Sequence, residues 1–108
     1  MEQIEFSDFK KLQMKVGEIK KVERVLNTKN LYKLQVDLGV EQRQIVSSLV
    51  PFYSEEELLN QKIIVLVNLK PTKFCGEASD GMLLCAEKDN ECVLLTVQKE
   101  IELGVSIT

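Results

Sequence analysis

The sequence contains no histidine and no tryptophan, and only two of its 108 residues are proline. Histidine is the side chain most often used as a general base near neutral pH, and it is the commonest metal ligand. Its absence excludes hydrolases that depend on a Ser-His or Cys-His pair. No pair of carboxylates stands at a spacing that indicates acid-base catalysis. We therefore expect no catalytic residue and no enzyme activity from the chain on its own.

Cysteines are also few: Cys75, Cys85 and Cys92 are the only three. No two of them have the CxxC spacing of a zinc site, and no histidine is available to complete one. We therefore expect neither a metal nor another cofactor. An odd number of cysteines without a secretory signal is typical of reduced thiols in the cytosol. Cys85 lies within an apolar run and is expected in the core.

Long hydrophobic runs are absent. The longest strongly apolar stretch, Ile63–Val67, is far shorter than a membrane span. The first residues carry glutamates where a signal peptide would carry positive charge. These features predict a cytoplasmic protein that has no contact with a membrane.

What the sequence does contain is a series of short strand signals, within a length typical of a single domain spanning residues 1–108. Apolar and polar residues alternate most clearly in LYKLQVDL, which predicts a half-buried strand. Its inward face would carry Tyr32, Leu34, Val36 and Leu38. Further strands are predicted at residues 15–25 (with a bulge permitted by Gly17), 43–49, 62–68, 82–87, 91–97 and 105–108. Residues 68–81 are predicted to form a long loop.

Two short helices are predicted. Ser7 is a good N-cap for a helix over residues 6–12, which would pack Phe9 and Leu12 inward. Ser54 and Glu57 have the spacing of a capping box, so a second helix is expected over residues 54–61.

An all-β chain with a helix between its third and fourth strands matches the oligonucleotide/oligosaccharide-binding (OB) fold, a five-stranded Greek-key barrel. The strands after residue 91 exceed what this barrel needs. They either cover the barrel or pair with a second copy of the chain.

The net charge of −3 conceals two basic blocks. Residues 10–33 carry a net charge of +6, and residues 62–76 carry +3 with no acidic residue. In a small barrel these blocks can meet on one side as a positive surface, although lysines on strands can also be merely solvated. Aromatic residues are few, and most are expected in core or helix packing. This composition favours contact with phosphates and recognition of RNA shape over stacking of successive bases.

The sequence resembles the tRNA-binding domain family, which includes the β subunit and C-terminal domain of methionyl-tRNA synthetase. Structure-specific tRNA-binding protein and endothelial monocyte-activating polypeptide carry the same domain. The matching segments, in family order, are DFKKLQMKVGEIKKVE (8–23), LYKLQVDLG (31–39), RQIVSSL (43–49), YSEEELLNQKIIVLVNLKP (53–71) and GEASDGMLLCA (76–86).

The resemblance implies an OB barrel that binds tRNA by the shape of its outer corner, without catalysis and without a role for DNA. It also implies a homodimer formed through the C-terminal extension, about residues 91–108. The tRNA contacts of the family map onto Lys15, Lys33, Asn68, Lys70, Lys73, Ser79 and Met82. Ser79 has an alternative role, which is to close its own loop through a turn hydrogen bond. Met82 has an alternative place in the core, at the start of a strand. Asn30 and Cys75 stand where many members have a basic residue, which predicts weaker binding.

These expectations give one main hypothesis and two alternatives. The main hypothesis is an accessory domain or β subunit of methionyl-tRNA synthetase that raises the tRNA concentration near a separate catalytic subunit. One alternative is a secretion-type chaperone of the same fold that binds unfolded peptide. The other is a structural module that holds a synthetase complex together through its C-terminal strands.

Overall fold

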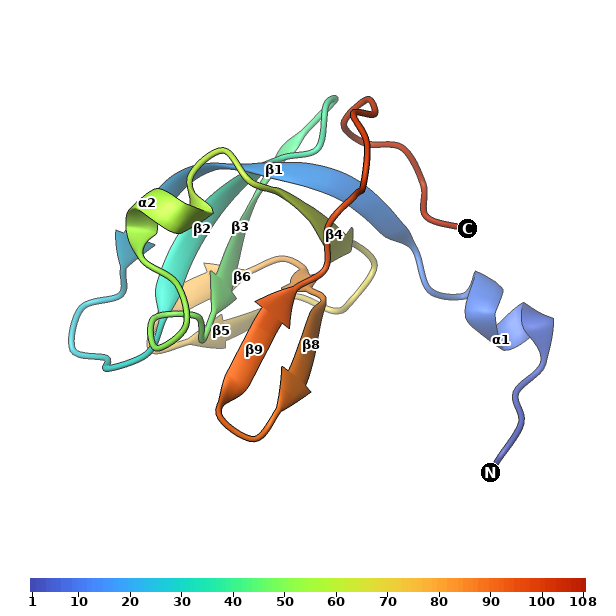
Figure 1. The fold of residues 1–108 in the computed structure, drawn as a ribbon, viewed down its shortest axis with the longest axis horizontal. Helices are drawn as coiled ribbons and strands as arrows, with labels where there is room; N and C mark the ends of the chain where they lie inside the picture. The colour runs from blue at the N-terminus through green and yellow to red at the C-terminus, as the bar shows by residue number, and fades with distance from the viewer.

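The computed structural model describes residues 1–108 and shows five antiparallel strands curled into a nearly closed barrel (Figure 1). The strands lie in the order β3-β2-β1-β4-β7. They are β1 (Met14–Arg24), β2 (Tyr32–Asp37), β3 (Gln42–Ser47), β4 (Lys62–Leu66) and β7 (Met82–Leu83). This arrangement confirms the predicted all-β class and OB-type barrel.

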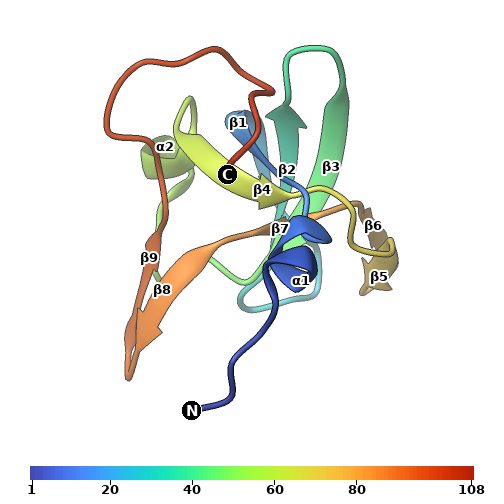
Figure 2. The same cartoon turned by 90° about the vertical axis from the view of Figure 1, so that its right-hand side faces the viewer.

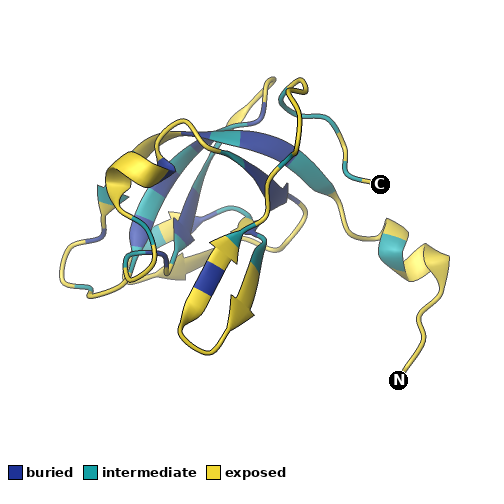
Figure 3. Ribbon diagram, in the orientation of Figure 1, coloured by how far each residue is buried: buried dark blue, intermediate teal, exposed yellow.

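The barrel core follows from the alternation on β2. The four residues predicted to face inward, Tyr32, Leu34, Val36 and Leu38, are all buried. They belong to a cluster of thirteen buried residues drawn from every barrel strand and from the loops between them. Figure 3 shows that the buried residues are concentrated on the strands of the curved sheet.

Strand β1 is the longest and forms the back of the barrel. Its second half pairs with β2 and its first half pairs with β4. The β-bulge lies between Ile19 and Lys21, not at Gly17 as predicted. A Cβ at Gly17 would lie 2.8 Å from Cγ1 of Val36, so this glycine serves the close approach of two strands.

The first helix, α1 (Phe6–Lys10), stands away from the barrel in Figure 1, and in Figure 2, where that side faces the viewer, it lies in front of the barrel. Its N-cap is Glu5, which forms a capping box with Asp8, so the prediction of Ser7 as N-cap is wrong. Leu12 is exposed and does not pack inward.

The second helix, α2 (Glu55–Leu58), lies between β3 and β4, as predicted. Ser54 Oγ accepts from Glu57 N at 3.2 Å, and Ser54 N donates to Glu57 Oε1 at 2.8 Å. The predicted capping box is therefore confirmed. Leu58 is fully buried, so α2 adds one side chain to the core. Both helices are too short to form a membrane-spanning segment.

Residues 68–81 are not the featureless loop that the sequence predicted. They contain a hairpin of β5 (Thr72–Phe74) and β6 (Glu77–Ser79). Its two turn residues, Cys75 and Gly76, have φ values of 51° and 84°, as a type I′ turn requires. All three residues of β5 are exposed, so the sequence has no apolar alternation that could indicate the strand.

The C-terminal region forms a second hairpin and a returning strap. The hairpin pairs β8 (Cys85–Lys88) with β9 (Glu91–Leu94) beside the barrel. Residues 105–108, expected as a strand, form only one isolated bridge, between Lys15 and Ser106. Backbone hydrogen bonds nevertheless hold residues 103–107, which we call the C-terminal strap, against β1: Gly104 N donates to Val16 O at 2.8 Å, and Ile107 N to Met14 O at 2.9 Å.

Candidate nucleic-acid interface

The hairpin β5–β6 carries two of the predicted contact residues, and Arg43 on β3 fixes both of its ends. Arg43 Nη1 donates to Val67 O at 2.5 Å, just before the hairpin segment. The same atom lies 3.5 Å from Asp80 Oδ1, just after it. The Arg43 side chain is mostly buried, and its Nε also pairs with Glu41. Arg43 therefore holds the entry and exit of the hairpin segment together. The guanidinium group suits this role because its several N–H groups point in fixed directions.

Asn68 anchors the same segment to the linker between α1 and β1. Its Nδ2 donates to Lys11 O at 2.7 Å, and its Oδ1 accepts from Gln13 N at 2.9 Å. The backbone N–H of Val67 also donates to Gln13 O, at 2.8 Å. Both ends of the Asn68 amide are thus used within the chain. This geometry favours a role in shaping the loop over direct contact with RNA.

Lys70 and Lys73 extend from this anchored segment. Both are exposed, and neither takes part in any of the seven ion pairs of the structure. An unpaired surface lysine can neutralise a phosphate without first breaking a contact inside the protein. Of the four lysines predicted to contact tRNA, these two therefore satisfy best the requirements of a phosphate-binding surface.

The other two lysines predicted to contact tRNA, Lys15 and Lys33, are less exposed. Lys33 on β2 is mostly buried, and its Nζ lies 3.4 Å from Glu77 Oε2 on the hairpin. Lys15 on β1 is half-buried beside the C-terminal strap. The structure thus brings Lys33 to the hairpin β5–β6, and it places Lys15 next to the strap.

Part of the first basic block is neutralised by neighbouring carboxylates. Lys20 lies 2.5 Å from Glu18, and Lys21 lies 3.0 Å from Glu23. The hydrogen bond that Lys20 donates to Glu18 raises the pKa of Lys20, and the hydrogen bond that Lys21 donates to Glu23 lowers the pKa of Glu23. Glu18 and Glu23 are the two acidic residues already subtracted in the net charge of +6, so these ion pairs show where on β1 positive charge is locally cancelled.

Ser79 closes the barrel. It is 3% exposed, and its Oγ accepts from Val46 N at 3.0 Å and donates to Gly81 O at 3.3 Å. Strand β3 has no ladder with β7, so this hydroxyl supplies one of the few links across the gap. The turn hydrogen bond considered as its alternative role is present. The burial of the side chain favours that role over RNA contact.

Replacing Ser79 by alanine is expected to lower the free energy of unfolding by about 1–3 kcal/mol, because the buried N–H of Val46 would lose its acceptor. The folded variant should keep the salt dependence of tRNA binding. Urea unfolding together with a binding series measures both quantities. Ser7→Ala is the control, because Ser7 is exposed and is not an N-cap. An unchanged stability with a weakened RNA affinity would instead place Ser79 at the interface.

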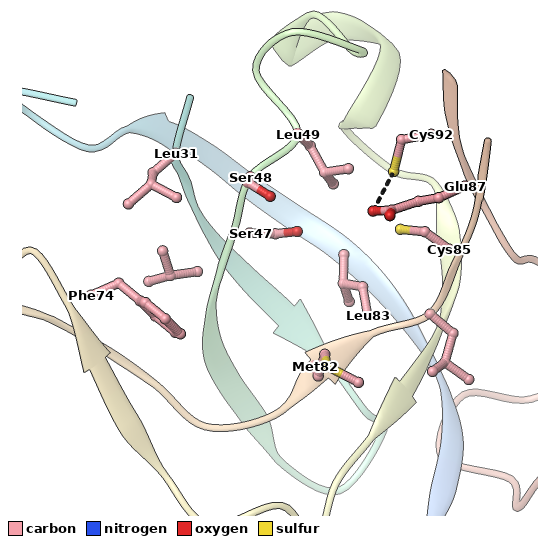
Figure 4. A pocket seen from close by; sticks show the side chains of 12 residues that line it. Leu31, Ser47, Ser48, Leu49, Phe74, Met82, Leu83, Cys85, Glu87 and Cys92 are labelled. Carbon is pink, nitrogen blue, oxygen red and sulfur yellow. Dashed lines mark hydrogen bonds between the residues drawn. The ribbon is translucent and has the colours of Figure 1, made fainter. Parts of the chain in front are cut away.

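Met82, at the start of β7, is exposed and lies at an apolar groove. Figure 4 shows Phe74 and Leu31 on one side of Met82, and Leu83 with Cys85 on the other. Sequence reasoning missed Phe74, because it assigned most aromatic residues to the core. Phe6, Phe52 and Phe74 are in fact exposed. The sequence signal that could have identified Phe74 as exposed is its position as an isolated aromatic residue between Lys73 and the Cys75–Gly76 turn.

Cys85 provides no reactive thiolate next to this surface. Burial, and then the neighbouring Cys92, raise the pKa of Cys85 to about 12, so its thiol stays protonated at neutral pH. Cys85 is half-buried and packs against the core cluster, whereas Cys92 belongs to that cluster. Cys75 is exposed at the hairpin turn. No group of three or more cysteine or acidic side chains is arranged to hold a metal ion.

The fold and the two unpaired lysines of the anchored segment, Lys70 before the hairpin β5–β6 and Lys73 within it, together define a small OB-fold binding module. The chain belongs to the family described as "Putative tRNA binding domain", whose model matches residues 14–106.

Proteins similar to this chain include methionine–tRNA ligases, a MetRS-related protein and a CsaA chaperone. Methionine–tRNA ligase of Archaeoglobus fulgidus is 49% identical over 106 residues, which is 98% of this chain but 16% of that protein. A MetRS-related protein from Pyrococcus horikoshii, known from its crystal structure, superposes with a TM-score of 0.94 and 43% identity over the whole of both chains. The CsaA chaperone from Picrophilus torridus superposes with a TM-score of 0.89 at 29% identity, over 98% of this chain and all of the other. The chain spans about one sixth of the length of the curated relatives that it matches.

Proposed function

We propose that the chain binds tRNA without catalysing a reaction on it, through phosphate contacts centred on Lys70 and Lys73. The observation that carries this proposal is the segment 68–80, which presents the unpaired Lys70 and Lys73 and is held at its ends by Arg43 and at its start by Asn68. A fixed segment loses little conformational freedom on binding, so its charge contacts are not offset by an ordering cost. Membership of the tRNA-binding domain family supports the identity of the nucleic acid.

We further propose that the chain serves methionyl-tRNA synthetase as an accessory domain or β subunit. Its similarity to methionine–tRNA ligases and to a MetRS-related protein supports this assignment. Bound to a catalytic chain, the module would raise the local concentration of tRNA without any new contact at the catalytic site. A role in translation and three free cysteines fit the reducing cytoplasm.

A homodimer is the third part of the proposal, with the extension of about residues 91–108 as its interface. This region exposes Val93, Leu95 and Ile101. Ile4, two residues before helix α1, and Phe6, its first residue, are also exposed and do not belong to the core cluster. A two-fold dimer that buries these side chains would also place two copies of the segment 68–80 on one particle.

The test of tRNA binding is a filter-binding series with an unmodified tRNA transcript at increasing salt concentration. If four phosphates are neutralised, the logarithm of the association constant should fall with the logarithm of salt concentration with a slope of about −3 to −4. Binding that does not depend on salt, or no binding at low salt, would contradict the proposal.

One observation favours a second candidate, a peptide-binding chaperone. The CsaA chaperone from Picrophilus torridus shares the fold at 29% identity, and an apolar groove is present beside Met82. This candidate predicts that the protein suppresses aggregation of an unfolded client and has no affinity for tRNA. Light scattering of a denatured test enzyme, with and without the protein, distinguishes the two functions.

A further inference from the structure

The hairpin β5–β6 has almost no apolar burial of its own. All three residues of β5 are exposed, and Ser79 is the only buried residue of β6. A segment with few buried apolar contacts opens locally at low cost unless other contacts hold it. The position of this hairpin on the barrel therefore depends mainly on polar contacts.

Strand β3 supplies most of these polar contacts. Gln44 Nε2 donates to Ala78 O at 2.8 Å, and Asp80 N donates to Gln44 O at 2.8 Å. Both of these hydrogen bonds hold the end of the segment 68–80. Of the side chains of β3, only that of Arg43 bonds on both sides of the hairpin, to Val67 O before it and to Asp80 after it. Arg43 is therefore the contact that fixes the start and the end of the segment relative to each other.

The surroundings of Arg43 make it a poor ligand for a phosphate. Its side chain is 20% exposed, and its guanidinium group pairs with the carboxylates of Glu41 and Asp80. Two carboxylates around one guanidinium group leave an excess of negative charge, which repels a phosphate. Any effect of Arg43 on RNA must therefore pass through the segment that it holds.

We propose that Arg43 is a positioning residue of the RNA surface. It determines the affinity for tRNA by holding the segment 68–80 where Lys70 and Lys73 meet the phosphates, and it does not touch the RNA itself. This inference rests on the proposed function, because those two lysines make the phosphate contacts. A loosened segment presents its lysines correctly for only part of the time, and the apparent dissociation constant rises as that fraction falls.

The chain has only two arginines, which gives a matched pair of variants. Arg43→Lys keeps the charge but loses the fixed directions of the guanidinium N–H groups. It should weaken binding of a tRNA transcript about 3- to 30-fold at fixed salt, because a charge-assisted hydrogen bond is lost at one end of the segment. The salt slope should not change, since no phosphate contact is removed. Arg24→Lys is the control and should bind as the wild type does, because Arg24 is exposed and its one hydrogen bond, to Lys29 O, is 3.5 Å long.

Amide hydrogen exchange separates positioning from a general loss of stability. The N–H of Asp80, which donates to Gln44 O, should exchange faster in Arg43→Lys, whereas the amides of β2 should exchange as in the wild type. Faster exchange throughout β2, together with an unchanged affinity of the folded protein, would give Arg43 a merely structural role and overturn the inference.

A second variant keeps the inference testable even when Arg43→Lys does not fold. Asp80→Asn removes the charge that pairs with Arg43 and makes the protein less negative, so charge alone predicts tighter binding of tRNA. Loss of the contact predicts the opposite, a weakening of about 2- to 10-fold. Asp89→Asn is the matched control. Asp89 lies exposed between β8 and β9, takes part in no ion pair, and has a positive φ of 51° that asparagine also tolerates, so this variant should not weaken binding.

The remaining outcomes distinguish this inference from the proposed function. If the wild type binds no tRNA in the filter assay, both fail. If the wild type binds and Arg43→Lys binds equally well, the positioning role is wrong while tRNA binding stands. If Asp80→Asn binds more tightly than the wild type does, this part of the surface acts through its charge, and the positioning role is again wrong.

Discussion

Replacing Lys70 and Lys73 together by alanine is expected to weaken tRNA binding roughly tenfold to a hundredfold near about 0.1 M salt, and to make the salt slope shallower by about 1.4 to 1.8. Each lysine that neutralises a phosphate releases condensed counterions, and the slope counts those contacts. The effect should be large for a small domain because no carboxylate lies in an ion pair with either lysine. Filter binding of one transcript at several salt concentrations measures both quantities.

The control for this double variant removes the same charge from another part of the surface. Lys88 and Lys99 are exposed and lie in the acidic C-terminal part of the chain, so Lys88→Ala with Lys99→Ala should leave the slope nearly unchanged. Equal losses in the two double variants would mean that net charge, and not the hairpin, determines affinity. If a catalytic synthetase chain is supplied, slower charging at low tRNA concentration with the Lys70/Lys73 variant supports the accessory role. Unchanged charging kinetics would favour the purely structural module.

The largest effect on stability is expected from Gly104→Ala in the C-terminal strap. Gly104 has φ +88°, and a Cβ added there would lie 2.3 Å from Leu38 O, a backbone atom that cannot move aside cheaply. The strap would have to leave β1, which breaks the hydrogen bond from Gly104 N to Val16 O. We expect a loss of about 2–4 kcal/mol in the free energy of unfolding, or a fall of roughly 10–25 °C in Tm. Thermal unfolding followed by circular dichroism measures this change.

Gly76→Ala is the matched control for this substitution. Gly76 has a similar φ of +84°, but an added Cβ would meet no atom within 4 Å. It therefore isolates the conformational cost of a positive φ, about 1–2 kcal/mol, from the clash with Leu38. A Gly104→Ala variant no less stable than Gly76→Ala would show that the strap is held loosely. If the extension also forms the dimer interface, the Gly104 variant should sediment as a monomer.

The parts of the fold that local chemistry determines were predictable from the sequence. Alternation along β2 identified the four inward residues, because side chains on a strand alternate between its two faces. The capping box of Ser54 and Glu57 located α2, because it satisfies two backbone N–H groups within four residues. The hairpin β5–β6 was missed because it packs outside the core, where no apolar pattern is required.

The candidate site was predictable in composition but not in arrangement. The basic block at residues 62–76 directed attention to Lys70 and Lys73, both of which are exposed. Contacts between residues that are distant in the sequence then give the predicted residues different roles. Lys33 pairs with Glu77, 44 positions away, and Ser79 bonds to Val46, 33 positions away. Counting charges along the sequence reveals neither of these contacts.

The position of Asn68 links the surface proposed to bind RNA with the region proposed to form the dimer. Its amide fastens the lysine-bearing segment to the carbonyl of Lys11 and the N–H of Gln13, which join α1 to β1. Whatever orders α1, including the second copy in a dimer, thereby restricts the same segment that meets the phosphates. Subunit association and RNA affinity are then thermodynamically linked, so each should strengthen the other by an equal factor.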